Sequence, residues 1–302
     1  MSHEHSHRGA NTVRLAIALA ITASVLVVEI VGAAISGSLA LLADAGHMGS
    51  DVLALIIALL ASAVAARPAT DRQTFGFQRA EVLGALANGL LLSGVAVFIA
   101  IEGIRRLIEP GRAEVAAVPM LIVAVIGLAA NGAALLVLRG GASTSINMRG
   151  AYLEVLGDAL GSVAVIVAGA VLLLTGFVQA DAIASLVIAA LIVPRALSLL
   201  RDVIRVLSES APRGTSVAEI REHLLAVDGV VGVHDVHVWA ITSGAPVFTA
   251  HVIVEPAIFS QGRAGGLLDE LSVCLAEHFD VAHSTFQLEP AGREHVETEH
   301  HD

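Results

Sequence analysis

The chain has 302 residues, of which 56% are hydrophobic and only 15% are charged. This composition excludes a disordered chain and an ordinary soluble enzyme, because average soluble domains are about a quarter charged. Acidic residues outnumber arginines by 28 to 17, and the whole excess lies in residues 208–302. The sequence therefore predicts a neutral membrane part joined to an acidic part that faces water.

Six apolar stretches are long enough to cross a membrane as helices, since a hydrocarbon core about 30 Å thick needs about 20 residues. We expect these spans at 13–35, 39–65, 82–104, 115–138, 151–175 and 178–200. An even number of spans places both termini on one side. Ten arginines fall on that side and three on the other, so the positive-inside rule predicts cytoplasmic termini.

After Ser208 the hydrophobic pattern changes to that of a small α+β domain. Helices are expected at 217–227 and 267–279, and strands at 230–241, 247–254 and 284–288, in the order αββαβ. The expected organisation is a histidine-containing cytoplasmic tail at 1–12, a six-helix transmembrane domain at 13–207, a cytoplasmic domain resembling metal-binding domains at 208–290 and an acidic, histidine-containing tail at 291–302.

Ionisable residues inside two of the spans suggest a metal site. In the second span Asp44, His47 and Asp51 have the spacing i, i+3, i+7, and in the fifth Glu154 and Asp158 have the spacing i, i+4, so each set shares a helix face. Charged groups within a membrane are costly and usually functional. We expect His47, Asp51, Glu154 and Asp158 to bind a divalent cation, the alternative being polar groups that only join helices. Imidazole with carboxylate suits Zn²⁺, Mn²⁺, Fe²⁺ or Co²⁺.

Two further intramembrane acids are candidates for a proton relay, Glu29 in the first span and Asp44 in the second. For Glu29, a position in a cavity open to the cytoplasm is an equally good interpretation.

Three sets of motifs together resemble the cation diffusion facilitator transporters. These are the paired motifs of spans two and five, the segment from Thr74 to Glu81, and the segment from Val233 to Trp239. The sequence is most similar to bacterial zinc, cadmium and cobalt exporters, from about Val13 to Pro290. The resemblance implies a homodimer in the inner membrane of a bacterium that exports zinc-like cations from the cytoplasm in exchange for protons. It also implies that the four ligands form the transport site and that the C-terminal domain is ferredoxin-like.

Two of the departures from the family concern the proposed metal ligands. Zinc-transporting members usually have His where Glu154 stands, so we expect Zn²⁺ as the main substrate, with Cd²⁺ and Co²⁺ tolerated and an Mn²⁺ or Fe²⁺ exporter as the alternative. In the C-terminal domain, His234, His251 and His283 match positions where relatives bind regulatory metal, although single histidines more often pack than bind metal. Relatives have a His and an Asp where this chain has Gln287 and Glu289.

Antiport follows from the chemistry of such ligands, because metal and protons compete for the same atoms. A membrane-embedded metalloenzyme and a metal sensor are the rival interpretations, but no further nucleophile or oxyanion-binding motif occurs in the spans, so we expect no enzyme. The expected partners are divalent cations, protons, membrane lipid and a second copy of the chain. Nucleic acid is not expected, because the acidic domain repels phosphate. Six tail histidines could gather metal: His3, His5, His7, His295, His300 and His301.

Overall fold

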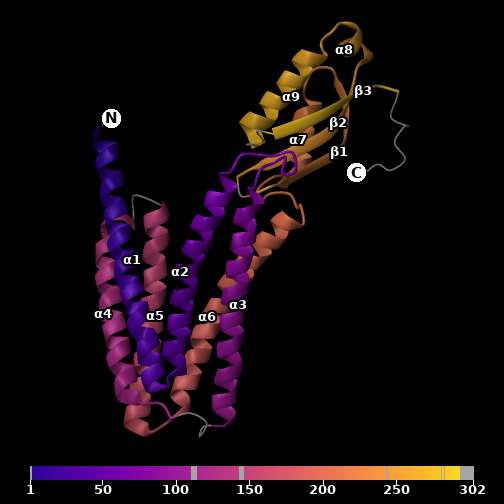
Figure 1. Cartoon of the computed structure of the whole chain (residues 1–302). Coiled ribbons are helices and arrows are strands. Elements are labelled where there is room, and N and C mark those ends of the chain that lie inside the picture. The colour runs from indigo at the N-terminus through magenta and orange to yellow at the C-terminus, as the bar shows by residue number, and fades with distance from the viewer. Residues whose placement is uncertain are drawn as a thin grey trace. The chain divides into compact units, whose positions relative to one another are not determined.

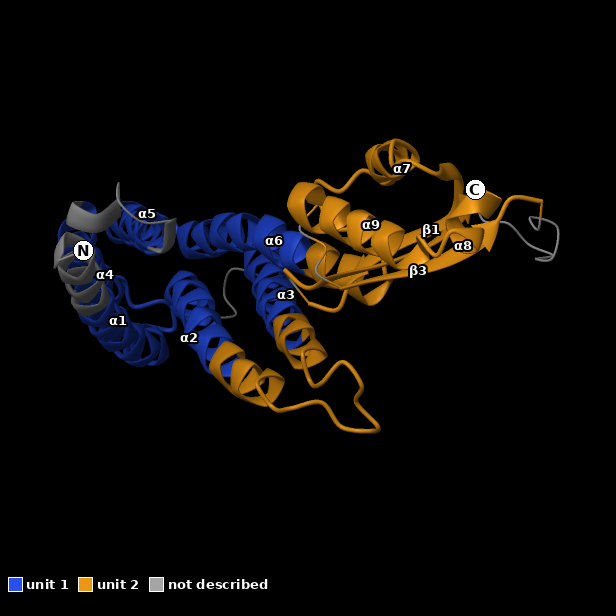
Figure 2. Cartoon of the chain, turned by 90° about the horizontal axis from the view of Figure 1, so that it is seen from above, with its two compact units in different colours: residues 1–57, 87–199 blue, residues 58–86, 200–302 orange. Residues whose placement is uncertain are grey.

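The computed structural model describes residues 2–109, 114–142, 146–242, 244–279, 281 and 283–292 (Figure 1). It divides into two compact units, one of residues 1–57 and 87–199 and the other of residues 58–86 and 200–302 (Figure 2). The C-terminal histidines His295, His300 and His301 lie outside the described residues, as do the side chains of His3, His5 and His7.

Six helices in the described part of the chain are long and apolar enough to cross a membrane, which confirms the expected number. They are α1 (Ser2–Ser36), α2 (Leu39–Ala65), α3 (Arg79–Ile108), α4 (Ala117–Ala142), α5 (Ile146–Thr175) and α6 (Gln179–Leu207). Several begin before the apolar stretch that predicts them, and α1 begins at Ser2. Polar residues can continue a helix beyond the hydrocarbon, because only the apolar core limits the span and not the helix itself.

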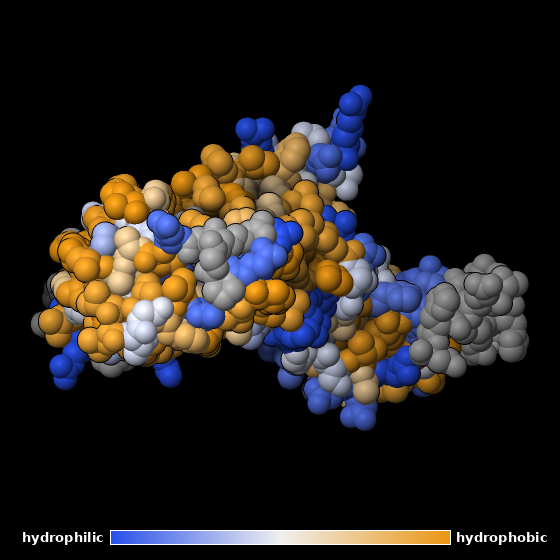
Figure 3. Space-filling view, turned by 90° about the horizontal axis from the view of Figure 1, so that it is seen from below, coloured by the Kyte–Doolittle hydropathy of each residue, from blue (hydrophilic) through white to orange (hydrophobic). Residues whose placement is uncertain are grey.

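The outer surface of these helices is apolar. Leu174 is 82% exposed and Leu59 and Leu136 are each 72% exposed. Figure 3 shows apolar residues over most of the visible face of the helical part. Soluble monomers rarely expose so large an apolar surface, so this surface is suited to lipid. The chain is a multi-pass membrane protein.

Small residues let the helices of the first unit approach closely. The helices α1, α4 and α5 lie side by side in Figure 1, and α4 packs along both of the others. Ala40, Ala43, Ala124 and Ala168 are among the buried residues of the core. Such packing is typical of membrane helices, whose association depends on close contact between backbones.

The beginning of α2 is held by the beginning of α6. The carboxylate of Asp181, which is 1% exposed, accepts hydrogen bonds from the Ser38 hydroxyl at 2.5 Å and from the N–H groups of Leu39 at 2.7 Å and Ala40 at 3.2 Å. An acid at a helix N-terminus satisfies free N–H groups and complements the helix dipole. Asp181 therefore fixes where α2 begins, and α2 carries the predicted ligands His47 and Asp51.

The C-terminal part of the second unit is an α+β domain. Its elements are α7 (Val217–Leu225), β1 (Val230–Ala240), β2 (Pro246–Val254), α8 (Pro256–Ser260), α9 (Ala264–Phe279) and β3 (His283–Pro290). The strand order is β1-β2-β3, with β1 antiparallel and β3 parallel to β2. Phe248, Leu271 and Leu275 are fully buried in its core. The expected elements are confirmed, and α8 is an addition that begins at Pro256, a residue suited to a first helical turn.

Candidate metal sites

The first candidate site brings together three of the four expected ligands of the membrane helices. Ligand atoms of His47 and Asp51 on α2 and of Glu154 on α5 all lie within 4.8 Å of one another. His47 is 8% exposed, and its Nδ1 lies 3.6 Å from Asp51 Oδ2. The i, i+4 spacing on α2 thus produces the shared face that the sequence predicts. One imidazole and two carboxylates are a donor set suited to a zinc-like cation.

Arg195 of α6 also enters this site, although it is not among the site residues expected from the sequence. Its Nη2 donates to both carboxylate oxygens of Glu154, at 2.6 and 2.7 Å, and its Nη1 lies 2.9 Å from His47 Nε2. The signal was present in the sequence, because Arg195 is an ionisable residue within an apolar helix, directly after Pro194. The rule that identified the acids applies equally to this cation.

Asp158, the fourth expected ligand, is not part of that group of three and lies one turn further along α5. It is one of five polar residues from four helices that are at most 2% exposed and have side-chain atoms without a hydrogen-bond partner among the described residues: Glu29, Asp44, Asn131, Asp158 and Ser162. Unpaired polar atoms are costly to bury. A cation, protons or water would satisfy these atoms.

Two glycines make room for this buried polar group. A Cβ at Gly161 would lie 2.5 Å from Asp44 Oδ1, and a Cβ at Gly127 would lie 3.0 Å from Glu29 Oε1. Larger residues at either position would displace the carboxylates. The two candidates for a proton relay, Glu29 and Asp44, therefore lie against the backbones of α4 and α5.

The second candidate site lies on the sheet of the α+β domain, where ligand atoms of His234, His251 and Glu289 come within 4.8 Å of one another. The strand register pairs His234 with His251. Glu289 lies 3.3 Å from His234 Nε2 and 3.2 Å from His251 Nδ1. Asp235 sits at an irregularity of β1 with a positive φ of 47°, and its carboxylate lies 3.1 Å from His234 Nδ1. Two imidazoles beside carboxylates form a second possible metal-binding donor set.

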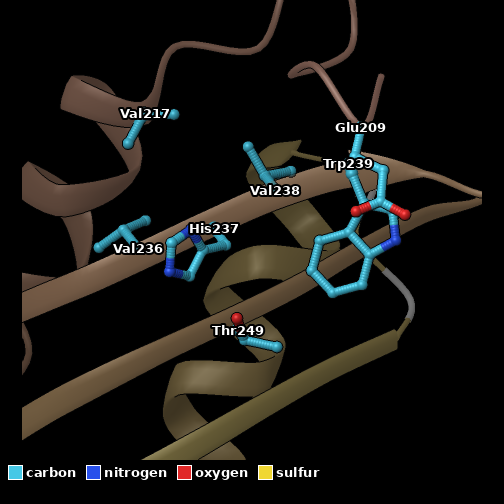
Figure 4. A pocket seen from close by; sticks show the side chains of 7 residues that line it. All are labelled: Glu209, Val217, Val236, His237, Val238, Trp239 and Thr249. Atoms are coloured by element: carbon cyan, nitrogen blue, oxygen red, sulfur yellow. The ribbon is translucent and has the colours of Figure 1, made fainter. Parts of the chain in front are cut away.

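Two other histidines of this domain, His283 and His237, do not join that group. His283 begins β3, six residues before Glu289, and packs its ring against Phe75 at 5.6 Å between centroids. The structure therefore does not bring His283 to His234 and His251. His237 and Trp239 instead line a pocket of about 430 Å³ with Val217, Glu209 and other residues (Figure 4).

The only cysteine of the sequence, Cys274, lies on α9. Burial and the nearby carboxylate of Glu277 raise the pKa of its thiol. A raised pKa disfavours the thiolate that binds metal ions. The sulfur is therefore a poor metal donor at neutral pH.

Comparison with known proteins shows which family the chain resembles. The family model described as the cation efflux transmembrane domain matches residues 15–208, and that of the cation efflux protein cytoplasmic domain matches residues 212–291. The metal cation efflux system protein CzcD of Cupriavidus metallidurans is 42% identical over 299 residues, which cover 99% of this chain and 93% of that protein.

Two other relatives are similar over almost their whole length. The cadmium, cobalt and zinc/H(+)-K(+) antiporter of Bacillus subtilis is 34% identical over 297 residues, covering 98% of this chain and 94% of that protein. The zinc transporter ZitB of Escherichia coli is 39% identical over 297 residues, covering 96% of this chain and 93% of that protein.

Proposed function

The chain belongs to the cation efflux family, and from this we propose that it is a proton-coupled antiporter that exports divalent transition-metal cations from the cytoplasm. The observation that carries the proposal is the group formed by His47, Asp51 and Glu154 inside the first compact unit. A metal-ligand group between two apolar helices suits a cation that crosses the membrane.

The ligands of the transport site are His47, Asp51, Glu154 and Asp158 in this proposal. Asp158 joins the other three when a cation is bound, because it lies one turn beyond Glu154 on the same face of α5. Imidazole and carboxylates bind metal only when they are deprotonated, so each bound cation excludes protons. If the site opens to each side of the membrane in turn, an inward proton gradient drives the cation outward. Glu29 and Asp44 are then placed to pass protons.

Zn²⁺ is the substrate that the donor set and the relatives favour most. The relatives' names include zinc alone and zinc with cadmium and cobalt. At equal concentration the Irving–Williams order makes Zn²⁺ a tighter binder than Mn²⁺ or Fe²⁺. Because the site contains up to three carboxylates, export of Mn²⁺ or Fe²⁺ is the second candidate.

The α+β domain is proposed to lie in the cytoplasm of a bacterial cell, as residues 208–290, and to bind a regulatory metal. His234, His251 and Glu289 are its proposed ligands. The protein is proposed to act as a homodimer in the inner membrane, with both termini cytoplasmic. Metal would offset the repulsion between two acidic domains brought together in the dimer.

The test uses the purified chain in sealed vesicles with a pH gradient, supplied in turn with Zn²⁺, Cd²⁺, Co²⁺, Mn²⁺ and Fe²⁺. We expect cation uptake that stops when the pH gradient is dissipated, and we expect no uptake by Asp51→Ala. Asp71→Ala is the matched control, because this exposed acid lies outside the helices. Equal uptake by Asp51→Ala and the unchanged protein would remove the proposed site. Uptake without turnover of any substrate separates a transporter from an enzyme or a sensor.

A further inference from the structure

Arg195 contacts two of the three residues that form the first candidate site. Its guanidinium donates to both oxygens of Glu154. A guanidinium has no acceptor, so at 2.9 Å His47 Nε2 must offer its lone pair to Arg195 Nη1. That lone pair is the one with which Nε2 binds a metal. Arg195 and a metal ion bound through His47 Nε2 therefore exclude one another.

We propose that Arg195 is an internal cation of the unloaded transport site, which the transported metal has to displace. This inference rests on the proposed function. In the absence of metal the guanidinium compensates the charge of Glu154, which would otherwise stand beside Asp51 between apolar helices. Arg195 remains charged throughout the cycle, so its part in transport is displacement and not proton exchange.

The helices of the single chain do not fully enclose the pair. The side chains of Arg195 and Glu154 keep 46% and 35% of their surfaces exposed in the single chain. Arg195 also lies on a different helix from both ligands, α6, so movement of its side chain leaves the backbones of α2 and α5 in place. A divalent ion carries twice the charge of the guanidinium, and this favours the exchange once the ion has entered.

A competing Arg195 and a merely structural Arg195 predict opposite effects of its removal on metal binding. If Arg195 only joins α5 to α6, its removal loosens the site and weakens metal binding or leaves it unchanged. If Arg195 competes with the metal, its removal tightens binding and slows release. A fall in KM together with a fall in kcat is therefore specific to competition.

The experiment measures the dependence of initial uptake on Zn²⁺ concentration in sealed vesicles for Arg195→Gln, Arg195→Lys and Arg201→Gln. We expect Arg195→Gln to lower KM by about tenfold, because it removes the charge-assisted bidentate pair with Glu154 that competes with the metal. Arg195→Lys keeps the charge but loses the fork geometry of the guanidinium, so its KM should lie between those of Arg195→Gln and of the unchanged protein. Arg201 lies six residues further along α6 and is exposed, so its substitution serves as the control. An unchanged or raised KM in folded Arg195→Gln overturns the inference.

A second measurement needs no substitution at Arg195. Phenylglyoxal modifies accessible guanidinium groups, and mass spectrometry reports the rate at each arginine of the unchanged protein. Saturating Zn²⁺ should accelerate modification of Arg195 severalfold, leave Arg201 unaffected and have no effect on either in Asp51→Ala. An Arg195 rate that does not rise with Zn²⁺ rejects the internal cation. If Asp51→Ala also transports normally, the proposed site fails as well, so the two failures are distinguishable.

Discussion

Replacement of Asp181 by Ala tests how far the transport site depends on the start of α2. The Asp181 carboxylate accepts three hydrogen bonds, from the Ser38 hydroxyl and from the N–H groups of Leu39 and Ala40. Alanine would leave these buried donors without their acceptor, at roughly 1–3 kcal/mol each. Relaxation of the first turn recovers part of this, so we expect a loss of about 4 kcal/mol in the free energy of unfolding.

The assay is thermal unfolding of the purified protein together with Zn²⁺ flux in vesicles. A loss of that size should lower Tm by roughly 10 °C, and flux should fall because His47 lies only two turns beyond the loosened end of α2. Asp181→Asn keeps one acceptor oxygen, so its Tm and its flux should lie between those of Asp181→Ala and those of the unchanged protein. Asp202→Ala is the control on the same helix, because its carboxylate is 46% exposed and pairs with Arg213 at the surface. A Tm for Asp181→Ala within about 2 °C of that of the control contradicts the reasoning.

Two further predictions concern the metal ligands. Asp51→Ala and Asp158→Ala should each abolish Zn²⁺ flux without changing Tm or the elution volume of the purified protein, and retained flux in both argues against the site. In the Asp51→Ala background, Glu289→Gln should weaken equilibrium binding of Zn²⁺ to the α+β domain by about tenfold or more, whereas His283→Ala should leave it unchanged. The reverse result would place His283 in the site.

The sequence was sufficient to predict the elements that depend on local pattern. An apolar stretch of about 20 residues specifies a membrane helix by itself, and alternating residues with turn signals specify the strands of the α+β domain. The face shared by His47 and Asp51 follows from helix geometry alone. The short helix α8 escaped prediction because five residues carry too little periodicity to distinguish a helical turn from a loop.

Features that depend on contacts between distant segments could not be predicted from the sequence pattern. Whether His283 or Glu289 lies beside His251 is decided by the register of β3 on β2, which pairs His283 with Val247. The approach of Arg195 to Glu154 depends in the same way on how α6 packs. The spacing of residues within a single helix cannot predict this approach. Both cases concern a charged or metal-binding group that lies far away in the chain from its partner.

Glu154→His tests whether the carboxylate at this position contacts the transported ion. A neutral imidazole in place of the carboxylate makes the donor set softer and less negative, which favours zinc-like ions over Mn²⁺ and Fe²⁺. It also removes the bidentate acceptor of Arg195, because an imidazole offers one lone pair and a carboxylate two oxygens. We therefore expect flux to be kept and the preference for Zn²⁺ over Mn²⁺ in kcat/KM to rise by roughly tenfold, or about 1.4 kcal/mol.

The matched control for this selectivity is Glu154→Gln, which removes the charge without adding a nitrogen ligand. It should lower flux for all five metals, and any change in their ratios should be smaller than in Glu154→His, because the amide oxygen is a weak ligand for every one of them. The decisive quantity is the ratio of kcat/KM values between metals, which does not depend on how much protein inserts into the vesicles. If Glu154→His transports the five metals with unchanged ratios, Glu154 does not touch the ion. The cation would then be bound by His47, Asp51 and Asp158, and Glu154 would serve only to hold Arg195.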